Sequence, residues 1–233
     1  MKKRMQWMFI TILVYSLTVL TSCSIEDNPR PSEQELFESE MTAALADAQV
    51  YGPHTQALAQ KVADRFDGRL TELSYKSRES ATRKCISSNL RPYQLRDLAR
   101  TTIAAGWDST EIKPVISYLV EISNEQSLAS YHRHQTSDYG YWGDVVNLQF
   151  ERLTTEIQVK TYGMFYASYS EDISRHVLGD SIYTIIRTKS GVEPGLSHYY
   201  YEIMRADTSS EATIEYYKQL AIQYHALFEH IKD

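Results

Sequence analysis

Apolar and polar side chains alternate along two neighbouring stretches in the middle of the chain, residues 142–150 and 153–161. This pattern is typical of β-strands that bury one face. Only two residues separate the stretches, so we expect them to form a β-hairpin. In the second stretch Glu156, Gln158 and Lys160 share the polar face, because strand side chains alternate with a period of two. On an ordinary half-buried strand such a face is simply solvated.

Apolar residues spaced about 3.6 positions apart predict helices on both sides of this hairpin. A helix is expected over residues 32–50, a break at Gly52-Pro53, and a second helix over residues 54–66. Other helices are predicted over residues 78–84 and 108–123, and the region after Tyr162 is predicted to be helical with one interruption, a turn at 191–195 that is followed by helices over 196–205 and 210–231. The other predicted strands cover residues 70–73, 98–104 and 126–135. Together these predict an α/β (α+β) fold: a mixed sheet of about five strands flanked by helices, with helical N- and C-terminal segments.

The N-terminus has the pattern of a bacterial targeting segment. Basic residues occupy positions 2–4, and residues 7–20 are mostly apolar but too short to predict a transmembrane helix. Leu20-Thr21-Ser22-Cys23 resembles a lipobox, which predicts a lipoprotein signal peptide over residues 1–22 and a lipid, including palmitate, on Cys23. We therefore expect a lipid-anchored protein of the cell envelope, at the outer membrane and with surface exposure as one possibility. The alternative is an N-terminal anchor with a chance cysteine.

Residues 23–40 differ in composition from the rest of the chain. Six acidic residues oppose a single arginine, and two prolines are present, which predicts an acidic flexible tether. Glu26 and Asp27, soon after Cys23, resemble the surface-export signal of Bacteroidetes lipoproteins. The folded domain is then expected over residues 41–233.

The composition indicates one globular domain with a sizeable core, since 42% of the 233 residues are apolar. The formal charge is −6, and removal of residues 1–22 would take away three further positive charges. An acidic protein is poorly suited to non-specific nucleic-acid binding, so no DNA partner is expected. If Cys23 is acylated, Cys85 is the remaining cysteine and no internal disulfide can form.

A basic segment and an acidic residue before a strand are candidates for chemistry. Ser77 is a suitable N-cap, and Ser80 and Lys84 share one helical face, with Lys76 just before the helix. A helix N-terminus with flanking cations suits a polyphosphate, although a solvated basic helix has the same pattern. Asp97 precedes a predicted strand, where its carboxylate can serve as an oxygen ligand for Mg²⁺.

The order of these segments resembles the synthetase domain of the RelA/SpoT family, which makes guanosine tetra- and pentaphosphate. The matching motifs are Lys76-x-x-x-Ser80-x-x-x-Lys84, Asp97, Gly140-Tyr141 and Glu156-Ile157-Gln158, in the family's order. Asp97-x-x-Arg100 and the late Tyr201-Glu202-x-x-Arg205 are closer to divergent members found in secreted toxins and phage proteins. The resemblance covers about residues 45–230.

The resemblance implies a nucleotidyltransferase-like fold and a pyrophosphokinase (GTP diphosphokinase-like) activity. Asp97 and Glu156 would hold Mg²⁺ at the polyphosphate of ATP, and the 3′-hydroxyl of an acceptor nucleotide or RNA would attack the β-phosphorus. Glu156 would also take the hydroxyl proton. Arg100 and Gln158 would contact phosphates or support these groups.

The same resemblance assigns the remaining predicted site residues. Lys76, Arg83 and Lys84 would neutralise phosphates, and Ser80 would donate a hydrogen bond to one of them. Tyr141 would stack on the base of the acceptor. A toxin-like enzyme of this kind also implies a cognate immunity protein as a partner.

Several positions depart from the family pattern. Ser74 stands where the family has an arginine, no lysine precedes Gly140-Tyr141, and Asp144 comes after that pair as an additional negative charge. The alternatives are therefore a catalytically degenerate nucleotide-binding or structural envelope lipoprotein, or an α-rich lipoprotein outside this family. No upstream hydrolase domain is recognisable, so alarmone hydrolysis is not expected.

Overall fold

The computed structural model describes residues 31–206, 209–229 and 231. The chain divides into two units, residues 1–36 and 37–233, and the sheet and its surrounding helices belong to the second. Cys23, the predicted signal peptide and the beginning of the predicted tether lie outside the described residues. Within the described part of the chain, no helix combines the length and the apolar character needed to cross a membrane.

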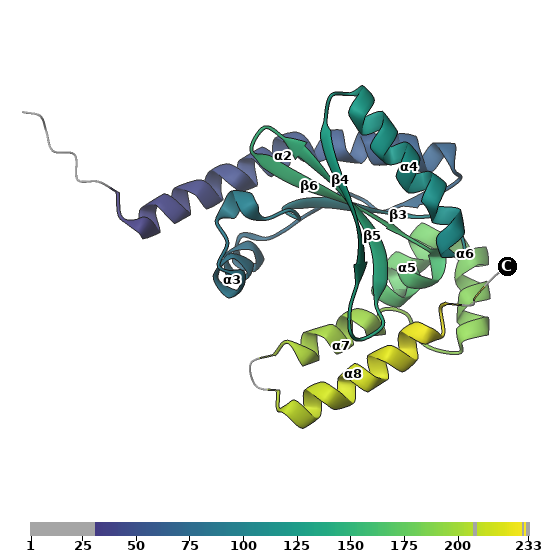
Figure 1. The fold of residues 1–233 in the computed structure, drawn as a ribbon. Helices are drawn as coiled ribbons and strands as arrows, with labels where there is room; N and C mark the ends of the chain where they lie inside the picture. The colour runs from purple at the N-terminus through teal and green to yellow at the C-terminus, as the bar shows by residue number, and fades with distance from the viewer. Residues whose placement is uncertain (1–30, 207–208, 230, 232–233) are drawn as a thin grey trace, which may run out of the picture. The chain divides into compact units, whose positions relative to one another are not determined.

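One mixed sheet forms the centre of this unit (Figure 1). Its strands are β1 (Arg69–Leu70), β2 (Ser74–Tyr75), β3 (Ala99–Ala104), β4 (Ala129–Thr136), β5 (Trp142–Phe150) and β6 (Leu153–Lys160). The order is β1-β3-β6-β5-β4, with β2 also paired to β3. Only the β3–β6 pairing is parallel among the described strands. The predicted hairpin of β5 and β6 and the predicted α/β class with a mixed sheet are confirmed.

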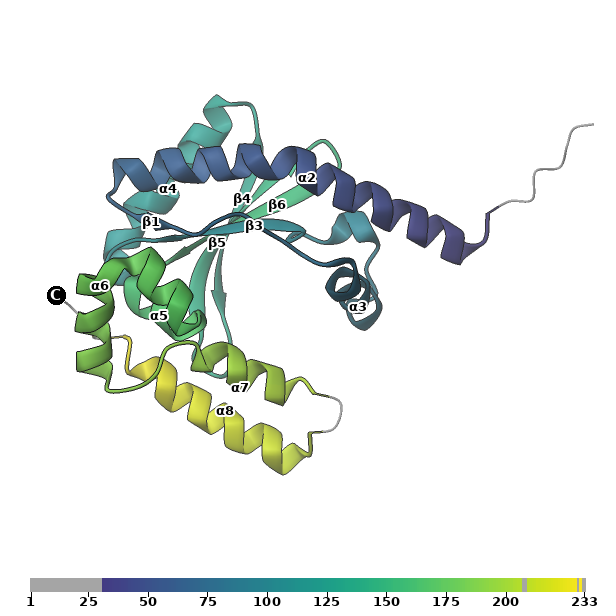
Figure 2. The same cartoon turned by 180° about the vertical axis from the view of Figure 1, so that it is seen from behind.

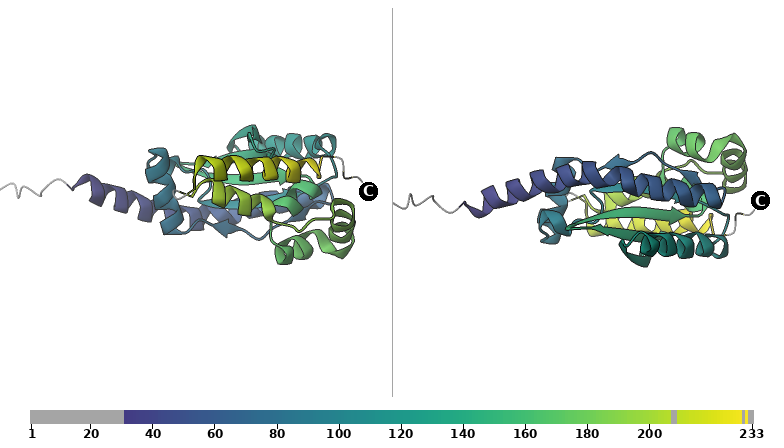
Figure 3. Two further views of the ribbon diagram at one scale, coloured as in Figure 1. Left: turned by 90° about the horizontal axis from the view of Figure 1, so that it is seen from below. Right: turned by 90° about the horizontal axis from the view of Figure 1, so that it is seen from above.

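Helices lie on both sides of the sheet (Figures 2 and 3). They are α2 (Glu33–Arg65), α3 (Arg78–Ser88), α4 (Ser109–Glu125), α5 (Tyr162–Ser168), α6 (Glu171–Ser190), α7 (Leu196–Met204) and α8 (Glu211–Ala226), with a short 3₁₀ turn at Pro92–Gln94. Seen from above, the purple α2 lies nearest the viewer, and seen from below the green-yellow α7 and α8 do (Figure 3). The sheet therefore separates α2 from the C-terminal helix pair.

Helices α2 and α4 cover the apolar face of the sheet. Their buried side chains pack against inward-facing residues of β3, β5 and β6 in one core: Leu58, Val62, Ile112, Val115 and Leu119 against Ile103, Val146, Leu148, Ile157 and Val159. The opposite side of the sheet, termed the polar face, carries Arg100, Glu156, Asn147 and Tyr131 side by side on β3, β6, β5 and β4.

The predicted break at Gly52-Pro53 is wrong, because α2 runs without interruption through both residues. Proline removes one helical hydrogen bond, but α2 buries Ala48 before it and Leu58 after it, and this burial outweighs the loss. Gly52 is a packing residue: a Cβ there would approach Tyr75 Oη to 2.8 Å. Gly52 therefore allows α2 to approach Tyr75 closely and does not end the helix.

The predicted tether also extends too far, since α2 begins at Glu33. Two of the acids assigned to the tether are tied to the fold: Glu38 pairs with Arg78 at 3.0 Å, and Glu40 pairs with Arg91 at 2.9 Å. At the other end, α8 ends at Ala226 and not at 231 as predicted.

The β4–β5 loop is held against the C-terminal helix pair by a buried histidine and by the ion pair between Asp138 and Lys218. His225 of α8 is buried and lies 2.9 Å from both the Tyr139 carbonyl oxygen and Ser197 Oγ. Burial lowers the pKa of His225, so the ring is neutral. Nδ1–H then donates to the Tyr139 carbonyl, and Nε2 accepts from Ser197. Gly140 of this loop has φ +84°, and a Cβ there would meet His225 Cβ and Ile222 Cα at 3.3 Å.

We expect Gly140→Ala to destabilise the protein more than Gly191→Ala. Both positions have positive φ, but a Cβ at Gly191 meets nothing within 4 Å. Both substitutions carry the left-handed backbone penalty of about 1–2 kcal/mol, and Gly140→Ala also forces the loop away from α8. Urea unfolding of the two variants measures the difference in the free energy of unfolding. Equal losses would contradict tight docking of the loop.

Candidate functional site

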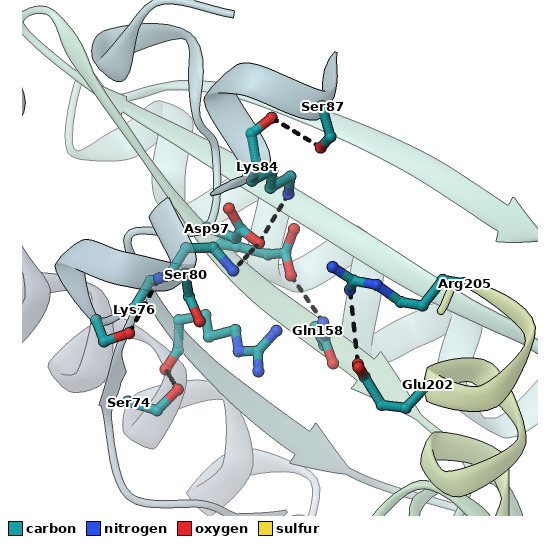
Figure 4. A network of polar contacts seen from close by, with 12 residues as sticks. Ser74, Lys76, Ser80, Lys84, Ser87, Asp97, Gln158, Glu202 and Arg205 are labelled. Atoms are coloured by element: carbon teal, nitrogen blue, oxygen red, sulfur yellow. Dashed lines mark hydrogen bonds and ion pairs between the residues drawn. The ribbon is translucent and has the colours of Figure 1, made fainter. Parts of the chain in front are cut away.

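Two lysines converge on one buried carboxylate at the start of β3 (Figure 4). Asp97 is 7% exposed, and its Oδ2 accepts from Lys76 Nζ at 3.0 Å and from Lys84 Nζ at 2.9 Å. Desolvation by burial raises the pKa of Asp97, but the two ammonium groups outweigh it, and the net shift is downward. The carboxylate is therefore ionised at neutral pH, in a cluster of one negative and two positive charges.

The N-cap of α3 fixes the start of the helix and so positions both lysines near Asp97. Ser77 is the N-cap of α3, as predicted, and its Oγ accepts from the Ser80 backbone N–H at 3.2 Å. Lys76 stands directly before the cap, and its backbone N–H donates to the Leu98 carbonyl at 2.9 Å. Lys84 lies two turns further along the helix and reaches the same oxygen of Asp97. The predicted basic helix thus points both lysines at the predicted metal ligand.

The second predicted carboxylate lies on the strand next to β3. The parallel register pairs Arg100 of β3 with Glu156 of β6. Glu156 is 5% exposed, and its Oε1 accepts from Gln158 Nε2 at 2.7 Å. Its Oε2 lies 3.6 Å from Arg133 Nη2 of β4. Three strands thus supply the surroundings of this carboxylate, and Figure 4 shows Gln158 beside the Asp97 cluster.

Tyr141 lies at the far end of the polar face, over a buried lysine. Lys160 is 4% exposed, donates to Ser168 Oγ at 3.0 Å, and lies 5.1 Å from the ring centre of Tyr141 and 5.2 Å from that of Tyr169. Burial lowers the pKa of Lys160 and raises the pKa of Tyr141, the latter also through the charge of Glu156. The phenol of Tyr141 therefore stays protonated, and its ring is held by a cation–π contact.

Two residues considered for the site lie elsewhere. Arg83 pairs with Glu79 one turn earlier on α3, at 3.2 Å and with both side chains exposed. Asp144 pairs with Val159 in the sheet register, which places it on the face opposite Glu156. Asp144 therefore does not stand beside Glu156 on the polar face, but its negative charge still contributes to the raised pKa of Tyr141. The buried carboxylate of Asp144 is met by His132 at 2.7 Å and by His134 at 3.2 Å.

The structure also adds residues that the predicted set lacked. Arg133 was absent from that set, yet it approaches Glu156 because β4 runs beside β5. Arg205, at the end of α7, points towards Gln158 in Figure 4 and pairs with Glu202 at 3.6 Å. The i, i+3 spacing of Glu202 and Arg205 in the sequence predicted that these two side chains interact. The sequence did not predict that α7 brings Arg205 towards Gln158.

The two carboxylates suit a hard divalent cation. Asp97 Oδ1 is buried and has no hydrogen-bond partner, and an ionised oxygen in that position is a ready ligand for Mg²⁺. Among the described residues no group of three or more His, Cys, Asp or Glu side chains could hold a metal by itself. Mg²⁺ is often bound by one or two carboxylates and completed by the phosphates of a substrate, and Asp97 Oδ1 would be one such ligand.

Comparisons with known proteins give one relative by sequence and one by structure. The chain is 32% identical, over 152 residues, to the (p)ppApp synthetase toxin Tas1 of Pseudomonas aeruginosa strain UCBPP-PA14, a match that spans 64% of this chain. The chain is homologous to this toxin. It spans about a third of the toxin's length (33%). No family model matches the chain.

The structural comparison agrees with this homology. The fold matches that seen in the crystal structure of the complex between the type VI effector Tas1 and its immunity protein, with a TM-score of 0.63 at 24% identity. The match covers 82% of this chain and 96% of the solved one. The sequence similarity to this toxin supports the predicted resemblance to toxin-type members of the RelA/SpoT family, and the structural match confirms the predicted fold.

The Asp97 cluster predicts a specific pH dependence of stability. The pKa of Asp97 is lowered in the folded protein, so its contribution is complete above the ordinary aspartate value of about 4 and is lost as the pH falls through the lowered folded value. We expect Asp97→Asn to be less stable than wild type at pH 7, and the difference to shrink as the pH falls below the ordinary aspartate value of about 4. Urea unfolding across this range measures it, with Glu79→Gln in the exposed pair as control. A difference that does not vary with pH would contradict the ionised cluster.

Proposed function

We propose that this chain is a Mg²⁺-dependent, toxin-like pyrophosphokinase that transfers pyrophosphate from ATP to the 3′-hydroxyl of an acceptor nucleotide. The observation that carries the proposal is the convergence of Lys76 and Lys84 on Asp97, beside the strand that carries Glu156. The homologous toxin is named a (p)ppApp synthetase, which favours an adenine nucleotide as acceptor over a guanine nucleotide or an RNA end.

The proposed roles of the residues follow from their positions in the site. Asp97 and Glu156 would hold Mg²⁺, which when bound neutralises charge on the polyphosphate. Lys76 and Lys84 rest on Asp97 and would bind phosphate oxygens of ATP, with Ser80 at the N-terminus of α3 as a further donor. Arg100, paired with Glu156 in the sheet, and Arg205, which points towards Gln158 in Figure 4, would add positive charge.

Glu156 would act on the acceptor. Its carboxylate accepts the proton of the 3′-hydroxyl while the hydroxyl oxygen forms a bond to the β-phosphorus of ATP. The bond between that phosphorus and the oxygen bridging to the α-phosphorus breaks, and AMP leaves with the electron pair. Gln158 orients the carboxylate through its 2.7 Å hydrogen bond. Tyr141, held over Lys160, would stack on the acceptor base.

We expect Glu156→Gln to lower pyrophosphate transfer by about 10²-fold or more, because it removes a general base while keeping the shape of the side chain. The measurement is transfer of label from ATP, with Mg²⁺, to a panel of ADP, ATP, GDP, GTP and tRNA. Glu79→Gln is the matched control, since it makes the same charge change on the exposed face of α3. No transfer by the wild type to any acceptor, or equal rates for Glu156→Gln and wild type, would overturn the proposal.

A second candidate function is nucleotide binding without catalysis. Ser74 stands where the resembled family has an arginine, and its Oγ donates to the Arg100 carbonyl at 3.3 Å, so this position supplies no charge to a phosphate. Tight Mg²⁺-dependent ATP binding measured by calorimetry, together with no transfer, would identify a degenerate nucleotide-binding lipoprotein.

We also propose that the protein is exported and lipid-anchored through Cys23 to the cell envelope, and that a cognate immunity protein neutralises it. The basic start, the apolar stretch and Leu20-Thr21-Ser22-Cys23 support the anchor. The homologous effector has been crystallised with its immunity protein, which motivates the partner.

We expect bacteria that express the wild type to incorporate labelled palmitate into the protein and to remove residues 1–22. Cys23→Ser should incorporate no label and keep these residues, because the acylated thiol is absent. Cys85→Ser is the control, since Cys85 is buried in the core. Gel mobility and mass spectrometry measure both outcomes, and an unprocessed, unlabelled wild type would show that Cys23 is not acylated.

A further inference from the structure

A cavity of about 310 Å³ lies on the polar face next to Glu156. It is lined by Arg96, Ala129, Ser130, Tyr131, Asn147, Gln149 and Thr154. Thr154 precedes Glu156 by two residues on the same face of β6, and Asn147 of β5 is paired directly with Glu156. The cavity therefore adjoins the carboxylate on the side away from Tyr141 and has the volume of a small-ligand pocket.

Asn147 has an unused hydrogen-bond acceptor at this cavity. Its side chain is 4% exposed, its Nδ2 donates to the Thr155 carbonyl at a long 3.4 Å, and its Oδ1 is buried with no partner. A buried acceptor without a donor is costly and rare. The other amide in the cavity, Gln149, is satisfied at both ends by the Glu151 carbonyl and by Thr154 Oγ1, each at 2.8 Å.

An aromatic ring stands beside this amide. Tyr131 of β4 is paired directly with Asn147 and is 60% exposed. Side chains paired across strands have Cβ atoms about 5 Å apart, so the ring and the carboxamide flank the same space. A ring offers stacking to the face of a flat heterocycle, and the carboxamide oxygen accepts an N–H from its edge.

The polar face has the layout of a two-nucleotide site. Along β6, Thr154, Glu156, Gln158 and Lys160 succeed one another at about 6.6 Å per step. The Tyr141 ring lies over Lys160 at one end, and the cavity with Tyr131 lies at Thr154, at the other. Glu156 thus lies between two positions that each have an aromatic side chain. An enzyme that transfers a group between two nucleotides must bind two bases, one on each side of the reacting atoms.

We propose that Asn147 and Tyr131 form a second nucleobase subsite, which binds an amino-bearing purine through an N–H donated to Asn147 Oδ1 and through stacking on Tyr131. This inference rests on the proposed function, since it assumes nucleotide substrates. Because Tyr141 is assigned to the acceptor base, the base held in this second subsite belongs to the donor, ATP.

The test compares bases with and without the amine in wild type and Asn147→Ala. Calorimetry with Mg²⁺ gives Kd for ATP against purine riboside triphosphate, and for GDP against IDP. Kinetics on the same pairs gives KM and kcat where transfer occurs. We expect Asn147→Ala to weaken ATP binding about tenfold and to abolish the wild-type preference for ATP over its amine-free analogue. A response of the GDP and IDP pair alone would overturn the assignment of this subsite to the base of ATP.

Tyr131→Ala and Tyr131→Phe keep the proposal testable if Asn147→Ala unfolds. Tyr131 is exposed, so both variants should fold, and we expect the alanine variant to weaken the same nucleotide whereas the phenylalanine variant, which keeps the ring, binds normally. Unchanged affinities in Asn147→Ala and Tyr131→Ala, or equal losses for bases with and without the amine, would overturn the subsite. Nucleotide binding without transfer would overturn the proposed function alone, and no nucleotide binding would overturn both.

Discussion

The parallel pairing of β3 with β6 is the constraint on which this structure depends. It joins strands that are more than fifty residues apart, sets Arg100 beside Glu156, and brings the Asp97 cluster next to the second carboxylate. The register is held by the other face, where Ile103, Ile157 and Val159 pack under α2 and α4. A slip of one residue in the register would turn Glu156 into this core. The register that buries the apolar side chains therefore also places the Glu156 carboxylate on the polar face.

Burial of charge explains the pairs found in the site. A buried carboxylate is stable in its ionised form when cations or donors meet it. Lys76 and Lys84 do this for Asp97, and Gln158 and Arg133 do it for Glu156. The cations that stabilise these carboxylates are also suited to bind a polyphosphate. The same cations thus stabilise the buried carboxylates and would bind the phosphates of the proposed substrate.

Local signals predicted most elements correctly, because each depends on neighbours in the chain. The alternation in β5 and β6 and the cap at Ser77 are of this kind. The errors came where a local signal has two physical meanings. Gly52-Pro53 can break a helix or fit one against a neighbouring segment, and only the position of Tyr75 decides between these. Acids before a domain can form a tether or pair with arginines, as Glu38 and Glu40 do.

The amino-acid sequence by itself determined the order of the motifs, the strand faces, and a resemblance that the similarity to the toxin supports. It could not place Arg133 beside Glu156, turn Asp144 to the opposite face, or bring Tyr131 and Asn147 to one cavity. These relations arise from strand pairing across the sheet. Pairing partners are chosen by burial of the whole apolar face, which no local stretch of residues encodes.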